Sequence, residues 1–319
     1  MHLFRRPRPG AQAVPSGCVA TIGVFDGVHL GHQLILDRVH GSAARLGLPS
    51  LVFSFEPTPQ EVMSPQQPPA RLMSLREKFL VLRSSGIDQL YCPPFERTLQ
   101  ELAPEEFIEQ LLVRTLGVRH LVVGDDFRFG RGRAGTFLHL EAGGRRHGFG
   151  VEQVGSVTVG GLRVSSTAIR NALASGDLAT ARQLLGRPYR MVGRVSRGRQ
   201  LGRQLGFPTA NMRLQRRVSP VRGIFAVRVH GVDEVVRDAV ASIGTRPTVA
   251  GVEPLLEVHV FDFDGDLYGC HIGVDFVARL RDETRFDDLE ALRRQMALDA
   301  AEARRLLADK GTADKGTQG

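Results

Sequence analysis

The sequence predicts an α/β domain built on a parallel sheet, followed by a small β-barrel that ends in a helix. Two observations predict this order. Strand-like and helix-like segments alternate over the first half, which is typical of parallel βαβ units. From Arg187 onward, short β-like runs follow one another with Gly, Pro and Asn between them, which favours a barrel. A chain of 319 residues has room for both, because domains usually contain about 100 to 200 residues.

In the first half, short apolar runs are expected to form strands, and helical patterns lie between them. The predicted strands cover residues 19–22, 51–55 and 121–124. The predicted helices cover residues 33–46, 75–84 and 104–116, and two shorter ones over 165–173 and 177–186 close a first domain at residues 1–186. Ligands of parallel sheets bind at the carboxyl ends of the strands, so residues 23–32, 55–59 and 124–130 are expected to converge.

In the second half, the clearest β-like runs cover residues 223–229 and 255–263. An amphipathic pattern over residues 289–307 predicts a final helix that packs on the barrel. The barrel domain is therefore placed at residues 187–307. The polar repeat Ala-Asp-Lys-Gly-Thr that starts at Ala308 and again at Ala313 predicts a disordered tail over residues 308–319.

The composition excludes several classes of protein. Hydrophobic residues make up 42% of the chain and charged residues 24%, which is typical of a soluble globular protein. No stretch approaches the roughly 20 apolar residues needed to span a bilayer, and the first 17 residues lack the apolar core of a secretory signal. Three scattered cysteines without a C-x-x-C pair argue against a disulfide scaffold or structural zinc. A cytoplasmic protein with no membrane partner is expected.

The basic residues limit how this chain binds phosphate. Lysine and arginine number 42 against 34 acidic residues, a net charge of +8, but lysine occurs only at Lys78, Lys310 and Lys315. None of these follows a glycine loop in the Walker A pattern, which excludes a P-loop enzyme. Phosphate binding would therefore depend on arginine, histidine and backbone N–H groups.

The segment from Gly23 to His32 follows a predicted strand and opens a helix. Its glycines let a nucleotide approach the backbone closely, and His29 and His32 share one helix face, where they could donate to phosphate oxygens during pyrophosphate displacement. A glycine-rich turn with a surface histidine pair is the plainer alternative, and a zinc site would lack a third nearby ligand. The nucleotide-binding candidates here are Gly23, Phe25, Asp26 and Gly27.

Two further segments of the first half are candidates for nucleotide binding. Asp126 lies in Gly-Asp-Asp-Phe-Arg-Phe-Gly after a predicted strand, where a carboxylate suits a ribose or a metal-bound phosphate. An acidic turn with solvated arginines is the alternative. Hydroxyl groups at the start of a predicted helix, with an arginine one turn later, suit an anion, although ordinary N-capping explains them as well. These residues are Ser165, Ser166, Thr167 and Arg170.

Nine arginines and no acidic residue occur between Arg187 and Arg217, which indicates a polyanionic partner, either a nucleotide or a nucleic acid. Within this stretch, Gly198 and Arg203 belong to a glycine loop that leads into Pro-Thr-Ala-Asn. On an extended segment Thr209 and Asn211 face the same side, so both oxygens could meet one Mg²⁺ held by ATP phosphates. A turn between barrel strands with surface Thr and Asn is the alternative.

Glu257 alternates with His259 and Phe261 on one face of a predicted strand. A carboxylate at this position could accept the proton of a substrate hydroxyl. A solvent-facing glutamate on a barrel strand is the commoner explanation for such a residue.

The first half contains four motifs that carry a resemblance: G-x-F-D-G-V-H-x-G-H from Gly23, F-E-P-x-P from Phe55, G-D-D-F-R-F-G from Gly124 and S-S-T-x-I-R from Ser165. They resemble, in order and spacing, the adenylyltransferase half of bacterial bifunctional riboflavin kinase/FAD synthetases. The resemblance implies a Rossmann-like nucleotidyltransferase in which His29 and His32 act on ATP phosphates, Asp126 lies by the nucleotide and the serine-threonine segment clamps a second phosphate.

The second half resembles the riboflavin kinase module of the same family, through G-R-x-L-G-F-P-T-A-N from Gly202 and L-E-V-H from Leu256. The resemblance implies a six-stranded barrel kinase with Thr209 and Asn211 on Mg²⁺ and Glu257 as the base. The sequence departs from the commonest pattern at Val24, Thr58, Phe225 and Ser242, where many members carry Asn, His, Tyr and Asn. Thr58 cannot supply an imidazole and is left out of the catalytic set.

The expected function is therefore flavin cofactor synthesis: ATP-dependent phosphorylation of riboflavin to FMN, then adenylylation of FMN to FAD with release of pyrophosphate. Both steps require Mg²⁺ to neutralise phosphate charge. Two alternatives remain, an enzyme with only one working module and an arginine-rich RNA-binding protein. The latter would place more aromatic residues among its arginines than Tyr189 and Phe207, so no nucleic acid partner is expected. The sequence indicates no oligomeric state.

Overall fold

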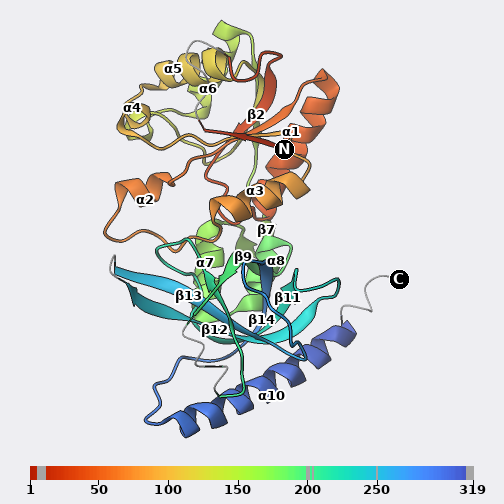
Figure 1. Cartoon of the computed structure of the whole chain (residues 1–319). Helices are drawn as coiled ribbons and strands as arrows, with labels where there is room; N and C mark the ends of the chain where they lie inside the picture. The colour runs from red at the N-terminus through yellow and green to blue at the C-terminus, as the bar shows by residue number, and fades with distance from the viewer. Residues whose placement is uncertain (6–11, 199–201, 203–204, 249–250, 314–319) are drawn as a thin grey trace. The chain divides into compact units, whose positions relative to one another are not determined.

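The structure is a computed structural model that describes residues 1–5, 12–198, 202, 205–248 and 251–313 (Figure 1). The chain forms two compact units. The first contains residues 1–69 and 75–165, and the second contains residues 70–74 together with those from 166 onward.

The first unit is built on a six-stranded parallel sheet with the strand order β1-β4-β3-β2-β5-β6. Every residue of the central strand β2 is buried, as expected for a parallel sheet covered on both faces. The predicted α/β class and its parallel sheet are confirmed. The strands are β1 (His2–Phe4), β2 (Cys18–Ile22), β3 (Ser50–Phe53), β4 (Gln89–Tyr91), β5 (Val118–Gly124) and β6 (Gly150–Val154).

The three helices predicted in the first unit are present, whereas α2, α4, η2 and α6 were not predicted. The predicted helix at 104–116 is divided, because α5 passes into a π-helix after Phe107. A short hairpin of β7 (Thr158–Val159) and β8 (Leu162–Arg163) follows the sheet. The helices are α1 (Leu30–Leu46), α2 (Pro59–Met63), α3 (Leu75–Ser84), α4 (Arg97–Gln100), α5 (Pro104–Phe107), the π-helix η1 (Ile108–Thr115), the 3₁₀-helix η2 (Arg131–Arg133) and α6 (Phe137–His147).

The second unit contains a closed antiparallel barrel with the strand order β10-β13-β12-β11-β14-β9, which confirms the predicted six-stranded barrel. Alternation along β13 separates two faces: Leu256 and Val258 are fully buried in the barrel, whereas Glu257 and His259 are partly exposed outside it. The strands are β9 (Tyr189–Ser196), β10 (Ala210–Arg213), β11 (Gly223–His230), β12 (Arg237–Thr248), β13 (Gly251–Val260) and β14 (His271–Arg281).

The C-terminal helix α10 (Leu289–Ala313) packs on the outer face of the barrel. Ala303 and Leu307 are buried there against Ala226 and Phe261. The predicted tail from Ala308 is wrong for residues 308–313, because α10 continues through them. One glycine in this polar repeat does not stop a helix that is already anchored by its apolar face. Residues 314–319 lie outside the described residues.

Two helices, α7 (Ser166–Ser175) and α8 (Leu178–Leu185), belong to the second unit, whereas the sequence analysis placed them in the first domain. The structure differs because α8 packs on β9 and β14, which sequence order alone does not reveal. The segment Ala70–Ser74 belongs to the second unit as well. Arg170 Nε donates to Ala70 O at 2.7 Å, and the Tyr189 hydroxyl donates to Leu72 O at 3.0 Å.

Candidate active sites

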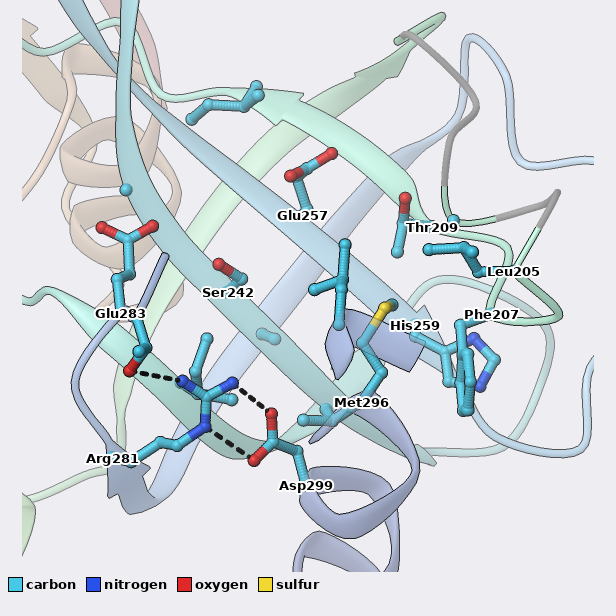
Figure 2. A pocket seen from close by; sticks show the side chains of 18 of the residues that line it. Leu205, Phe207, Thr209, Ser242, Glu257, His259, Arg281, Glu283, Met296 and Asp299 are labelled. Carbon is cyan, nitrogen blue, oxygen red and sulfur yellow. Dashed lines mark hydrogen bonds and ion pairs between the residues drawn. The ribbon is translucent and has the colours of Figure 1, made fainter. Parts of the chain in front are cut away.

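A pocket of about 620 Å³ lies on the outer face of the barrel (Figure 2). Strands β10, β12 and β13 form its floor. The loop before β10 lies at one end, and the end of β14 with α10 lies at the other. Its walls mix carboxylates, hydroxyl groups and aromatic rings, so it suits a ligand with both polar and apolar parts. Polar lining residues are Thr209, Asn211, Ser242, Thr245, Glu257, His259, Arg281, Glu283, Thr284 and Asp299.

Three polar residues form a row across the floor of this pocket. Asn211 on β10 pairs with Glu257 on β13, and Glu257 pairs with Ser242 on β12. Directly paired residues of antiparallel strands point to the same face, so all three side chains point into the pocket. The structure therefore brings Asn211 and Glu257 together with Ser242, which the sequence analysis noted only as a departure from the family pattern.

Two glycines before β10, Gly198 and Gly202, lie very close to other residues of the pocket. A Cβ atom at Gly198 would overlap the amide of Asn211, and one at Gly202 would overlap the carbonyl of Phe207. Asn211 is 5% exposed, and its Nδ2 donates to Thr209 O at 3.3 Å, which directs the amide group relative to the Thr209 backbone. Arg203, predicted to bind the nucleotide, lies outside the described residues.

The oxygen atoms on the pocket floor are suitable ligands for Mg²⁺. The Thr209 hydroxyl, the Asn211 amide oxygen and the Glu257 carboxylate are hard oxygen ligands. Among the described residues, no group of three or more His, Cys, Asp or Glu side chains could hold a metal by itself. Mg²⁺ is usually bound through one or two protein oxygens together with substrate phosphates, so an all-protein cage is not required.

The opposite wall of the pocket is fixed by an ion pair. Arg281 at the end of β14 binds Asp299 of α10 through two bonds, Nε to Oδ1 at 2.8 Å and Nη2 to Oδ2 at 2.6 Å (Figure 2). Such a two-point arginine-carboxylate contact fixes both side chains. Nearby, desolvation raises the pKa of Glu283, and the Arg222 and Arg281 guanidinium groups oppose that shift. The wall thus joins the barrel to the helix that closes the pocket.

In the first unit, the loop from Gly23 to His32 follows β2 and opens α1, as predicted. His29 is the N-cap residue of α1, and its Nδ1 accepts from the His32 backbone N–H at 3.2 Å. The two imidazole rings stack with centroids 3.6 Å apart, and the Phe25 ring lies 4.7 Å from His32. A Cβ atom at Gly23 would come 3.0 Å from the Phe25 ring, so a larger residue there would press against this ring.

The rest of this loop is tightly held. Asp26 is 4% exposed and His29 is 7% exposed, while Phe25 and Val28 adopt positive φ values of 49° and 42°. Residues without glycine's freedom adopt this conformation at an energetic cost, so the surrounding structure must enforce it. The surrounding structure therefore holds the histidine pair in a fixed position.

Lys78 is a residue of this site that the sequence analysis missed. Its Nζ donates to Val24 O at 2.7 Å and to Ser54 Oγ at 2.9 Å, so it anchors the start of the loop. Lys78 is 2% exposed on α3, one turn before the buried Leu82. Its place on the apolar face of that helix was the signal available in the sequence.

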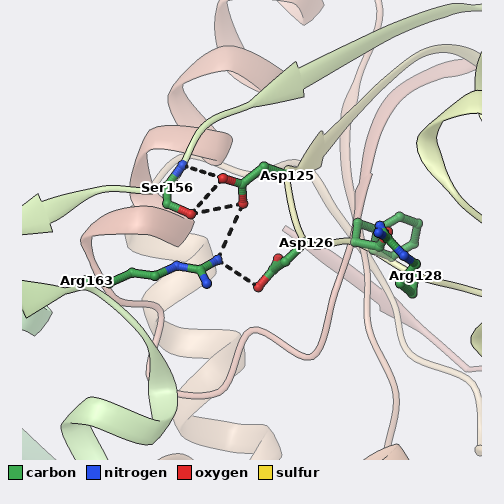
Figure 3. Close-up of polar contacts among 6 residues, drawn as sticks. Asp125, Asp126, Arg128, Ser156 and Arg163 are labelled. Carbon is green, nitrogen blue, oxygen red and sulfur yellow. Dashed lines mark hydrogen bonds and ion pairs between the residues drawn. The ribbon is translucent and has the colours of Figure 1, made fainter.

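Asp125 and Asp126 lie after β5, as predicted, but their partners come from far along the chain (Figure 3). The Ser156 N–H and hydroxyl both donate to Asp125, at 2.9 Å and 2.7 Å to Oδ2. These bonds, with the Arg163 guanidinium, lower the pKa of Asp125. Arg163 Nη2 lies 3.1 Å from Asp126 Oδ2, whereas Arg128 points away from both carboxylates in Figure 3.

The structure also places the other residues that the sequence pointed to. Thr58 is the N-cap of α2, where it forms a capping box with Glu61. Ser166, Thr167 and Arg170 belong to the second unit, and Ser165 ends the first. Their predicted place beside the histidine pair therefore stays a prediction.

Comparison with known proteins divides the chain in two. The FAD synthetase family model matches residues 11–168, and the riboflavin kinase family model matches residues 185–307. The bifunctional riboflavin kinase/FMN adenylyltransferase of Escherichia coli strain K12 is 47% identical over 304 residues, which cover 95% of this chain and 97% of that protein. The chain belongs to this bifunctional family.

A second relative has the same description, and a solved structure is similar to this chain over most of its length. The protein of the same description from Pseudomonas fluorescens is 50% identical over 293 residues, covering 92% of this chain and 94% of that protein. A crystal structure described as a macrolide-efflux protein from Streptococcus pneumoniae is 30% identical, has a TM-score of 0.78 and covers 93% of this chain and 97% of that one. Within the described residues, no helix is long and apolar enough to cross a membrane.

The two family matches separate the two sites. The riboflavin kinase match contains the row of Asn211, Glu257 and Ser242, and the FAD synthetase match contains the histidine pair and the Asp125–Asp126 turn. Each match therefore has a site of its own.

Proposed function

We propose that this chain phosphorylates riboflavin to FMN at the barrel pocket and adenylylates FMN to FAD in the first unit, with ATP as co-substrate of both reactions. The observation that carries the proposal is that each family match lies mainly within one of the two compact units and contains a polar site of its own. The product of the first reaction is the substrate of the second, so one chain would perform two consecutive steps.

At the barrel pocket, Glu257 is proposed as the general base. Its carboxylate faces the pocket between Asn211 and Ser242, where it can accept the proton of the riboflavin 5′-hydroxyl. Thr209 and Asn211 are proposed to hold Mg²⁺, which supplies neutralisation of the ATP phosphates. Gly198 and Gly202 let the backbone approach the nucleotide closely, and we place Arg203 beside its phosphates.

In the first unit, His29 and His32 are proposed to stabilise charge that develops on the α-phosphate as pyrophosphate leaves. Their place at the N-terminus of the 17-residue helix α1 supports this role, because the helix dipole favours anions there. Gly23, Phe25, Asp26 and Gly27 are proposed to shape the nucleotide site, and Asp126 to lie beside it. The segment from Ser165, the last residue of the first unit, to Arg170 of the second is proposed as a second phosphate clamp.

We propose that the protein is cytoplasmic and has neither a nucleic acid nor a membrane partner. Much of the arginine run that suggested a polyanion is engaged within the barrel unit. Arg190 binds Asp275 through Nε at 2.5 Å and Nη2 at 2.7 Å, and Arg216 is 6% exposed. Arg194 donates to Gly269 O at 3.0 Å. Each of these three guanidinium groups already has a hydrogen-bond partner within the barrel unit, which favours the enzyme over an RNA-binding surface.

The direct experiment incubates purified protein with riboflavin, ATP and Mg²⁺ and separates riboflavin, FMN and FAD by chromatography. The proposal expects FMN to appear first and FAD to follow. Accumulation of FMN without FAD would show that only the kinase module works. A binding assay with RNA at increasing salt tests the alternative of an RNA-binding protein.

A further inference from the structure

A histidine in the barrel pocket contacts the turn that carries the proposed metal ligands. His259 on β13 lies with its Nδ1 2.9 Å from the carbonyl oxygen of Pro208. A carbonyl oxygen only accepts hydrogen bonds, so Nδ1 must carry the proton and donate it. The Pro208 carbonyl therefore fixes the tautomer of the neutral ring, with the proton on Nδ1.

This hydrogen bond lies just beyond the end of the pairing between β10 and β13. Strand β10 pairs with β13 from Ala210 opposite Val258 onward, and this pairing does not extend back to Pro208. The His259 side chain bonds the backbone at the point where the strand ladder has ended. It therefore ties the Pro208–Thr209 peptide to β13.

The ring of His259 is itself held in place. The Phe207 ring meets it edge-on with centroids 5.4 Å apart, and the Phe261 ring also meets it edge-on at 5.7 Å. Phe261 is 3% exposed and packs against α10, so it offers a rigid support. A donor held this way has little freedom to leave its acceptor.

We propose that His259 is a positioning residue for the kinase reaction, which fixes the Thr209–Asn211 turn relative to Glu257. Glu257 lies two residues before His259 on the same face of β13, and the Pro208 carbonyl belongs to the peptide that leads into Thr209. One strand thus carries the base and, through the imidazole, sets the position of the proposed metal ligands. The inference rests on the metal site of the proposed function.

Two substitutions separate the hydrogen bond from the packing. His259→Asn keeps a donor, because the amide nitrogen of asparagine stands close to where Nδ1 of histidine stands, but it removes the ring. His259→Phe keeps the aromatic contacts and removes the donor. The readout is the Mg²⁺ concentration that gives half the maximal rate of riboflavin phosphorylation, measured with the full-length protein at saturating riboflavin and ATP.

The expected result is asymmetric. His259→Phe should raise the required Mg²⁺ concentration by about tenfold, the effect of about one hydrogen bond, while the riboflavin KM stays near that of the parent. His259→Asn should stay close to the parent. Impairment by His259→Asn alone would show that the ring acts only through packing and would overturn the proposal. Equal impairment by both substitutions, or no change with either, would overturn it as well. Riboflavin binding, followed by flavin fluorescence, shows that each variant keeps a folded pocket.

A third variant, Thr209→Val, distinguishes this inference from the proposed metal site. It removes the hydroxyl and keeps the shape of the side chain. If Thr209→Val raises the Mg²⁺ requirement and His259→Phe does not, the positioning role is wrong and the metal site stands. If Thr209→Val leaves the Mg²⁺ requirement unchanged, the metal site at this turn is wrong and the role of His259 falls with it.

Discussion

Replacing Arg216 by methionine tests how the barrel unit is held together. The Arg216 side chain is 6% exposed and donates from Nη1 to Arg71 O at 3.1 Å, to Leu72 O at 3.3 Å and to the Tyr189 hydroxyl at 2.9 Å. Its Nε donates to Leu214 O at 3.3 Å. One guanidinium thus joins the segment Ala70–Ser74 to the start of the barrel.

The magnitude follows from what each acceptor loses. Leu72 O keeps the Tyr189 hydroxyl as a donor at 3.0 Å, so the loss falls mainly on Arg71 O and Leu214 O. A buried carbonyl that loses its donor costs about 1–3 kcal/mol. Burying methionine instead of a charged group returns part of this. We expect a net loss of about 2–4 kcal/mol in the free energy of unfolding, which for a unit of this size lowers Tm by about 4–16 °C.

The assay is thermal unfolding by differential scanning calorimetry, with the barrel transition identified as the one that shifts when riboflavin is added. Arg213→Met is the matched control, since Arg213 lies exposed on β10 and the same substitution there removes no buried contact. An unchanged barrel transition in Arg216→Met, or an equal shift in Arg213→Met, would refute this reasoning.

Three further predictions test the other parts of the account. Ser156→Ala should raise the pKa of Asp125 toward the ordinary value of about 3.9, measured by NMR of the carboxyl carbon, and an unchanged titration would contradict the role of Ser156. Because the folded-state pKa of Asp125 is lowered, its stabilisation is present above the ordinary value and is lost as pH falls through the lowered one. His32→Ala should lower FMN adenylylation by about 10² or more and leave riboflavin phosphorylation near normal, whereas equal loss of both activities would indicate misfolding. Residues 187–319 expressed alone should make FMN but no FAD, and formation of FAD by this fragment would contradict the division of the two sites. Because the fragment lacks α7, α8 and Ala70–Ser74, it should lose kinase activity at a lower urea concentration than the full chain.

The sequence predicts those elements whose signals are local. The run that begins at Val19 is a buried strand, and the helix at Leu75–Ser84 begins and ends where its pattern does. The strands β1 and β4 were missed, because three residues are too few to show alternation. Local patterns also identified the glycine loop before α1 and the alternating face of Glu257.

Contacts between distant segments could not be predicted in this way. Ser156 lies 31 residues after Asp125, and no local pattern connects them. The same holds for Arg216, whose acceptors near Arg71 lie 145 residues earlier in the chain. The arginine run looked like a polyanion site because composition does not show which guanidinium groups will find partners within the chain. Tertiary packing decides this, and it assigned Arg190 and Arg216 to structure.

The central claim is that two separate sites perform consecutive reactions, and mixing two variants tests it most directly. Glu257→Gln should lower riboflavin phosphorylation by about 10²- to 10⁴-fold but still convert supplied FMN to FAD, and His32→Ala should show the reverse. Neither variant alone should then convert riboflavin to FAD efficiently, and an equimolar mixture should do so, because FMN made by one variant serves the other. A mixture no better than its components, although FMN accumulates and each variant retains its expected single activity, would contradict the claim.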